Sequence, residues 1–265
     1  MYFNIQSKAN NYLCLMKIVI LGSGNVAYHL AKVFHDKKIP VVQIFGRNEH
    51  DLQEISEKFQ IPYSTSALAD ADFYLIAVKD DAIAEISTKI TKNDCVVAHT
   101  SGSLPKEVLQ GNFRKASFYP LQTFSKSRDL NFADIPIFVE AENDRDYESL
   151  RELAFSISEN VLVSSYEKRK YIHLTAVFAC NFVNHLFARA KEISDSQDIP
   201  FKYFLPLIRE TTYKIELMEP KLAQTGPAVR NDENVLQTHE ALITNEEHLK
   251  IYHLMNESIK KMYEL

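Results

Sequence analysis

Residues 17–27 read KIVILGSGNVA. The run from Ile18 to Leu21 is continuously apolar and rich in β-branched residues, as in a strand buried on both faces of a parallel sheet. Two glycines follow within three residues. From Val26 onward, apolar residues recur at helical spacing. The stretch therefore predicts a strand, a tight turn and a helix in direct succession.

The same alternation of strand and helix continues to about residue 165. The predicted strands are residues 17–21, 41–45, 73–78, 95–99, 115–118, 135–140 and 161–164. The predicted helices are residues 25–37, 49–59, 81–89, 104–111 and 145–158. This order predicts an α/β fold with a mostly parallel sheet and helices on both of its faces.

The pattern after Ser165 is entirely helical, with helices predicted at about 167–194, 201–219, 233–240 and 244–263. We expect an α/β domain over residues 16–165 and a separate all-α domain over residues 166–265. Residues 1–15 carry a polar stretch, and the sequence from Met16 reads like a fresh start into the first strand. Residues 1–15 are therefore interpreted as a leader without a part in function.

Composition excludes several classes of protein. The 265 residues carry a formal net charge of −5, which disfavours a broad nucleic-acid-binding face. The three cysteines, Cys14, Cys95 and Cys180, form no CxxC pair, so neither a disulfide framework nor a zinc site is expected. No apolar run approaches the ~20 residues that span a bilayer. We expect a soluble cytoplasmic protein without a membrane or nucleic-acid partner.

The glycine-rich stretch GSGNVA predicts a dinucleotide site. The first glycine permits the turn, the second lets the backbone approach a pyrophosphate, and the small Ala27 allows the helix to pack on the sheet. The free N–H groups at the helix start attract phosphate. The predicted pyrophosphate ligands are Gly22, Ser23, Gly24, Asn25 and Val26. The alternatives to a dinucleotide site are a purely structural turn and an S-adenosylmethionine site.

The end of the second strand indicates which cofactor is bound. It reads Ile44-Phe45-Gly46-Arg47-Asn48, without the acidic residue that binds the ribose 2′-hydroxyl of NAD. The guanidinium of Arg47 can pair with a 2′-phosphate. NADP is therefore the expected cofactor, with Arg47 and Asn48 at the 2′-phosphate. The alternative for Arg47 is a solvated surface position.

Ligands of such sheets lie beyond the carboxyl ends of the strands. Val78 ends one predicted strand and Lys79 follows it, and both are expected near the nicotinamide ribose or ring. Ser101 follows the next strand and is a candidate substrate contact, whereas Ser103 before Leu104-Pro105 is expected to cap a helix.

A helix over residues 171–185 is apolar around almost its whole circumference, so it should be buried. His173 and Asn184 lie about 20° apart on a regular α-helical wheel, and Asn181 lies about 80° from His173. These residues either form an internal hydrogen-bond network or bind substrate beside the nicotinamide. His173 is then the candidate proton donor.

The sequence resembles a family of NADP oxidoreductases. The resemblance covers residues 16–265 and rests on GSGNVA (22–27), HTSGS (99–103), PLQTF (120–124), HLTAVFACNFVNHL (173–186) and TGPAVRND (225–232). More distantly, the N-terminal half is similar to pyrroline-5-carboxylate reductase and F420-dependent NADP reductase. Tyr119 stands where relatives carry His. 3-Hydroxyacid dehydrogenases carry a lysine and an asparagine four residues apart, and this pair is not evident on the 173–186 helix, where His173 is followed by Val177 at that spacing.

The resemblance implies a Rossmann-like N-terminal domain and a helical C-terminal domain like that of 6-phosphogluconate dehydrogenase, through which many relatives dimerise. It also implies reduction of a small carbonyl or imine, or oxidation of a hydroxy acid, in the cleft between the domains. We therefore expect an NADP-dependent oxidoreductase with a small-molecule substrate, assembled as a homodimer. The alternative is a non-catalytic NADP-binding sensor or scaffold.

Overall fold

The computed structural model describes residues 16–265. The leader predicted for residues 1–15 lies outside these residues. Within the described range, no helix has both the length and the apolar character that crossing a membrane requires.

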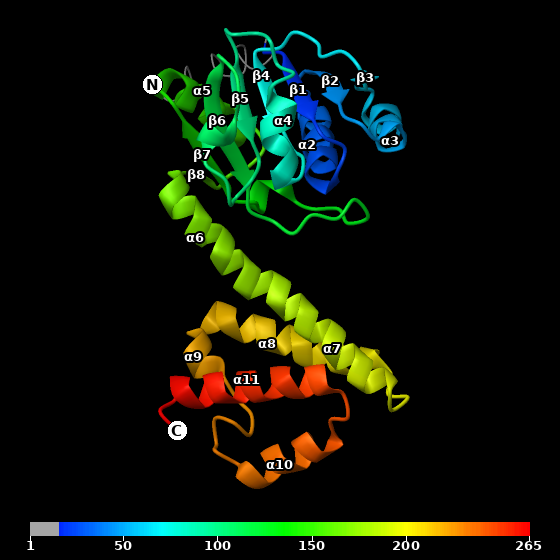
Figure 1. The fold of residues 1–265 in the computed structure, drawn as a ribbon, viewed down its shortest axis with the longest axis vertical. Helices are drawn as coiled ribbons and strands as arrows, with labels where there is room; N and C mark the ends of the chain where they lie inside the picture. Colours follow the sequence, from blue (N-terminus) through cyan, green and yellow to red (C-terminus); the bar gives the residue numbers. More distant parts are fainter. Residues whose placement is uncertain (1–15) are drawn as a thin grey trace. The chain divides into compact units, whose positions relative to one another are not determined.

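An eight-stranded sheet organises the N-terminal part of the chain (Figure 1). Its strands lie in the order β3-β2-β1-β4-β5-β6-β7-β8. All neighbours are parallel except β6 and β7, which are antiparallel. The strands are β1 (Ile18–Leu21), β2 (Val41–Phe45), β3 (Tyr63–Ser64), β4 (Phe73–Ile76), β5 (Val96–His99), β6 (Arg114–Pro120), β7 (Ile137–Ala141) and β8 (Val161–Val163). Strand order reverses at β1, and such switch points create a ligand-binding crevice in α/β sheets.

Two apolar layers enclose the sheet, because successive strand residues point to opposite faces. Ile18 and Ile20 pack with helices α2 (Asn25–Asp36), α3 (Glu49–Phe59) and α5 (Asp144–Phe155). Val19 and Leu21 face the other layer, which includes α4 (Ile83–Ser87). All four β1 side chains are fully buried. At about 1.5–3 kcal/mol for each buried aliphatic side chain, they anchor the strand from which the glycine turn leaves.

The predicted α/β fold is thereby confirmed, with helices on both faces of a mostly parallel sheet. From residue 166 to the end, every regular element is helical. These elements are α6 (Tyr166–Ala176), a π-helix (Val177–Phe182), α7 (Val183–Asp195), a 3₁₀ turn (Phe201–Phe204), α8 (Leu205–Leu217), α9 (Pro220–Ala223), α10 (Glu233–Leu242) and α11 (Glu246–Met262).

The chain divides into two compact units, of which the first extends to Asn181 and the second comprises Phe182–Leu265. The first unit includes α6 because Arg169 and His173 on this helix bond to residues of the sheet. The domain boundary predicted between residues 165 and 166 stays a prediction.

Two local predictions differ from the structure. The helix expected over residues 104–111 is only a 3₁₀ turn at Lys106–Val108. Ser103 does not cap it, because the turn begins after Pro105 without a side-chain cap. The two-residue strand β3 was not predicted, since two residues carry no recognisable periodicity.

Candidate functional site

A cavity of about 850 Å³ opens at the carboxyl ends of β1, β2 and β4. All nine residues predicted to bind the cofactor line it, namely Gly22, Ser23, Gly24, Asn25, Val26, Arg47, Asn48, Val78 and Lys79. Ligand pockets for drug-sized molecules span about 300–1,000 Å³. The cavity therefore has room for a dinucleotide at the place where this sheet reverses its strand order.

The two positions of the turn are occupied by glycine for different structural reasons. Gly22 has φ +132°, and a Cβ at this position would lie 2.1 Å from the carbonyl oxygen of Ala77, so no other residue fits. A Cβ on Gly24 would meet nothing within 4 Å, although Gly24 lines the cavity. Packing thus requires the first glycine, whereas the second leaves open space for a ligand to approach the backbone.

Helix α2 begins at this turn without a side-chain cap and without an acidic residue in its first turn. Helices α3, α5, α10 and α11 each begin with a capping Asn or Asp and with an acidic first turn. The first N–H groups of α2 therefore have no side-chain acceptor at the cap, and the first turn carries no carboxylate that would offset the positive end of the helix dipole. This end suits a pyrophosphate.

Arg47 and Asn48 follow β2 at the cavity edge. Arg47 is exposed, and none of the ion pairs among residues 16–265 involves it. Asn48 is the N-cap of α3, where its side chain accepts a hydrogen bond from the Asp51 N–H at 3.4 Å. Arg47 is thus available to an anion, and Asn48 has a structural role besides its predicted one.

Further residues line the cavity, some of which the sequence analysis did not single out. Asp51 lies in the first turn of α3, Thr65 follows β3, and Glu85 and Lys89 come from the α4 region. Asp51 lies three residues after the N-cap Asn48, the position at which a capping side chain meets the helix, and this spacing could have indicated a place beside Asn48. The other three come from elements that nothing in the sequence ties to the glycine turn.

The loop after β6 is tied to the start of α2. The side-chain amide of Asn25 donates to the carbonyl of Phe124 at 2.9 Å, and its oxygen accepts from the Lys126 N–H at 3.3 Å. The His29 ring lies 2.9 Å from the Ser125 carbonyl. The predicted cofactor residue Asn25 therefore also fixes the loop that carries PLQTF.

Ser101 has a clear local role in the turn after β5. Its hydroxyl accepts hydrogen bonds from the N–H groups of Ser103 at 3.1 Å and Leu104 at 3.2 Å. Ser103 instead lies 2.5 Å from a carboxylate oxygen of Asp80, to which its hydroxyl donates. Ser101, and not Ser103, therefore organises the turn that leads to Gly102.

His173 lies against Tyr119, within the first unit of the chain. The Tyr119 hydroxyl oxygen is 3.0 Å from His173 Nδ1, and the two rings meet edge to face. Gly102 closes the group, since a Cβ there would lie 2.6 Å from the Tyr119 ring and 2.8 Å from His173 Nδ1. Burial raises the pKa of Tyr119 to about 12. The phenol is therefore protonated at neutral pH, and its hydroxyl can donate to Nδ1 of a neutral imidazole or accept from Nδ1–H of an imidazolium.

The helix that carries the predicted polar stripe is not a regular α-helix. Residues Val177–Phe182 form a π-helix, and each residue inserted in this way turns those after it by about 100°. The 20° separation calculated for His173 and Asn184 therefore does not apply. Asn181 and Asn184 are both exposed, and their predicted contacts with substrate remain predictions.

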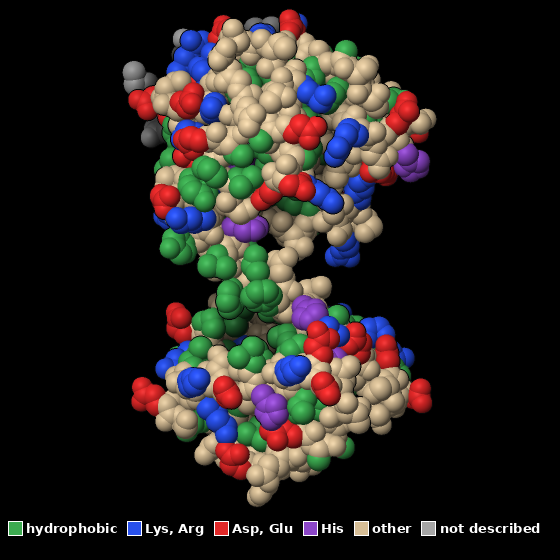
Figure 2. All heavy atoms as spheres, in the orientation of Figure 1, with side chains coloured by type: hydrophobic (Ala, Val, Ile, Leu, Met, Phe, Trp, Pro, Cys, Tyr) green, Lys and Arg blue, Asp and Glu red, His purple; other side chains and the backbone are tan. Residues whose placement is uncertain are grey.

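The expected burial of this helix is wrong for the single chain. Tyr171, Leu174 and Phe178 are 64%, 49% and 63% exposed, and Figure 2 shows hydrophobic side chains gathered along α6. The apolar circumference of this segment therefore does not predict its exposure correctly.

A buried ion pair that the sequence pattern does not predict ties α6 to the sheet. Arg169 is fully buried and donates to Glu140 at 2.6 Å and to the Leu104 carbonyl at 2.8 Å. It precedes His173 by four residues and therefore lies on the same side of the helix. Arg169 thus fixes the part of α6 that presents His173 to Tyr119.

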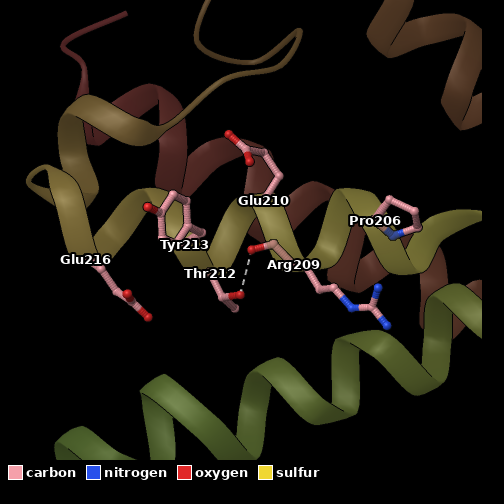
Figure 3. Close-up of a pocket in the computed structure, with 6 residues that line it drawn as sticks. All are labelled: Pro206, Arg209, Glu210, Thr212, Tyr213 and Glu216. Carbon is pink, nitrogen blue, oxygen red and sulfur yellow. Dashed lines mark hydrogen bonds between the residues drawn. The ribbon is translucent and has the colours of Figure 1, made fainter.

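A second hollow, of about 520 Å³, lies on α8 in the C-terminal unit. All of its lining residues belong to this one helix (Figure 3), and Thr212 turns its hydroxyl to the Arg209 carbonyl of the same helix at 2.9 Å. No predicted site residue lines this hollow, so the larger cavity is the candidate site.

The chain shares 38% sequence identity with a Bacteroides fragilis protein described as a "putative NADP oxidoreductase". The match covers 94% of this chain and 99% of the other, with a TM-score of 0.90. The chain belongs to this NADP oxidoreductase family. Residues 17–102 also match the family described as NADP oxidoreductase, coenzyme F420-dependent. Residues 135–259 match a domain of unknown function, DUF2520.

Other solved structures share the fold at lower identity. A Thermotoga maritima protein is 22% identical, with a TM-score of 0.78 over 94% of this chain and 100% of its own. A Streptococcus pyogenes 1-pyrroline-5-carboxylate reductase is 14% identical, with a TM-score of 0.58 over 93% of this chain and 98% of its own. No curated protein matches the chain. The predicted family and its distant similarity to pyrroline-5-carboxylate reductase are confirmed.

Proposed function

We propose that the protein is an NADP-dependent oxidoreductase that transfers hydride between NADP(H) and a small carbonyl, imine or hydroxy-acid metabolite. One observation carries the proposal. The glycine turn, the uncapped start of α2 and the unpaired Arg47 all line one cavity, which also reaches Thr100. Two residues after Thr100, Gly102 packs against Tyr119 and His173. The family to which the chain belongs supports the choice of cofactor.

The residues of the cavity fit NADP along its length. The N–H groups at the start of α2 and the open side of Gly24 would hold the pyrophosphate, and Arg47 would pair with the 2′-phosphate. Val78 and Lys79 would border the nicotinamide ribose. When bound, NADPH supplies the hydride.

The chain itself must supply the proton that accompanies hydride transfer to a carbonyl or imine. We assign this role to the imidazolium form of His173, whose Nδ1–H would donate to the Tyr119 oxygen and whose Nε2 would give its proton to the substrate, leaving a neutral imidazole. A histidine whose second nitrogen is bound by a partner presents a defined donor toward a substrate. The carbonyl or imine would then lie beside His173.

A calorimetric titration with NADPH and NADH tests the cofactor assignment. We expect NADPH to bind at least about tenfold more tightly, a difference of ~1.4 kcal/mol. Arg47→Glu should remove this preference, because it places a carboxylate where the 2′-phosphate would bind. Unchanged NADPH affinity in Arg47→Glu would contradict the placement of the 2′-phosphate. Tight binding without turnover on any carbonyl or imine would favour a sensor.

We further propose that the protein is a homodimer. Among the apolar residues of Phe182–Leu265, only Ala228 and Leu236 are buried. Large side chains such as Leu207, Leu222 and Leu242 are 65–76% exposed. A unit of this size needs more apolar burial than it has by itself, and association of two copies through these exposed side chains would supply it. The two described cysteines are free, which agrees with the cytoplasmic location that we propose.

A further inference from the structure

We infer that Lys126 determines the preference for NADP over NAD by neutralising Asp51 at the edge of the cavity. The inference rests on the proposed function. It adds a specificity-determining residue that lies on a different segment of the chain from the glycine turn and Arg47.

Asp51 is an acidic residue close to the end of β2. It lines the same cavity as Arg47 and Asn48, and its carboxylate accepts a hydrogen bond from the Asn48 side-chain amide at 2.7 Å. An acid in this region suits NAD, because it can accept a hydrogen bond from a ribose hydroxyl. Toward a 2′-phosphate, the same carboxylate is repulsive. An NADP site that contains Asp51 therefore needs a cation to offset it.

Lys126 provides that cation. Its Nζ lies 3.1 Å from Asp51 Oδ1 and 3.2 Å from Glu54 Oε2, and its side chain is only 23% exposed. Its backbone N–H donates to Asn25 Oδ1, so the start of α2 holds the segment that carries the charge. The cation is thus fixed beside the acid and is not a freely moving surface lysine.

Lys58 provides a matched control within the same cluster. Its Nζ lies 2.9 Å from Glu54 Oε1, and both lysines lie near the Tyr28 ring, at 5.2 Å and 5.9 Å. Among the ion pairs of residues 16–265, Asp51 pairs with Lys126 at 3.1 Å and with the His50 ring at 3.9 Å, and not with Lys58. The two lysines therefore differ in their contact with the acid that lines the cavity.

The experiment measures NADPH and NADH affinities of the wild type, Lys126→Ala and Lys58→Ala by calorimetry at low ionic strength. We expect Lys126→Ala to weaken NADPH binding roughly five- to tenfold, with NADH binding unchanged or tighter. Lys58→Ala should stay within about twofold of the wild type for both nucleotides. The double variant Asp51→Asn/Lys126→Ala should recover NADPH binding to within about twofold, because the repulsive acid is gone.

Ionic strength provides a second readout. The loss in Lys126→Ala should shrink in ~1 M salt, where charges are screened beyond about 3 Å, whereas a loss caused by disturbed packing would persist. The inference would be overturned if Lys126→Ala bound NADPH as tightly as Lys58→Ala, or if Asp51→Asn did not reverse the loss of NADPH binding. Either result would leave the proposed function standing. A folded wild type that binds neither nucleotide would overturn both.

Discussion

His99 lies fully buried at the carboxyl end of β5, where its Nδ1 accepts a hydrogen bond from the Ser101 N–H at 3.2 Å. Burial, together with the nearby Arg169 charge, lowers the pKa of this imidazole from 6.5 to about 4. His99 is therefore neutral in the folded protein at pH values at which it would be protonated in the unfolded chain. The residue contributes no charge to the site, but it makes folding sensitive to acid.

This sensitivity can be measured. The unfolded state binds more protons than the folded state between pH 6.5 and about 4, so stability should fall as pH decreases through this window, by about 3 kcal/mol in all. His99→Asn keeps an acceptor for Ser101 and does not titrate. Its unfolding free energy should show a shallower pH dependence, whereas the exposed His50→Asn should follow the wild type. Parallel curves for His99→Asn and the wild type would refute the assignment.

Removing His173 tests the chemistry at residue level. In His173→Gln we expect kcat to fall by about 10²–10⁴, the usual contribution of a general acid, on the carbonyl or imine that the wild type reduces. NADPH affinity should be unchanged, because His173 does not line the cofactor cavity. Tyr119→Phe should lower kcat less and alter its pH profile, since the ring loses only the hydrogen bond at Nδ1. Equal kcat in His173→Gln and the wild type would rule out this proton donor.

At the level of elements, the N-terminal strands could be predicted because they are short runs rich in β-branched and apolar residues between turn signals, and the structure confirms β1 and β2 within one residue. The glycine turn was also predictable, since its steric requirement is local. The turn after β5 was not. There, Ser101 accepts the hydrogen bonds that organise the turn, and Ser103 bonds to Asp80, which comes from a different strand connection.

The π-helix at Val177–Phe182 could not be predicted from the sequence either. Helical-wheel arithmetic assumes 3.6 residues per turn, and nothing in the composition of VFACNF signals a change of period. The buried pair of Arg169 and Glu140 was equally hidden, because its partners are 29 residues apart and lie on different elements. Ion pairs between residues far apart in the sequence can be identified only in the folded structure.

For the whole molecule, the proposed homodimer leads to a measurable expectation. Sedimentation at micromolar concentration should give twice the mass of 30.5 kDa. Leu207→Glu, on the exposed surface of α8, should shift the protein toward monomer, because a buried unpaired carboxylate opposes association. Leu162→Glu is the matched control, since Leu162 is 46% exposed on β8 in the first unit. A monomeric wild type would show that the helical unit needs no second copy.

The two glycines of the turn also differ in the variation that they can tolerate. Any side chain at Gly22 would collide with the backbone of Ala77, so a variant at this position is lost through misfolding before its activity matters. At Gly24 the backbone has an ordinary φ of −77° and space beside it, so folded variants can persist there. Inactive copies of the gene that still yield intact protein should therefore accumulate changes at codon 24 and not at codon 22.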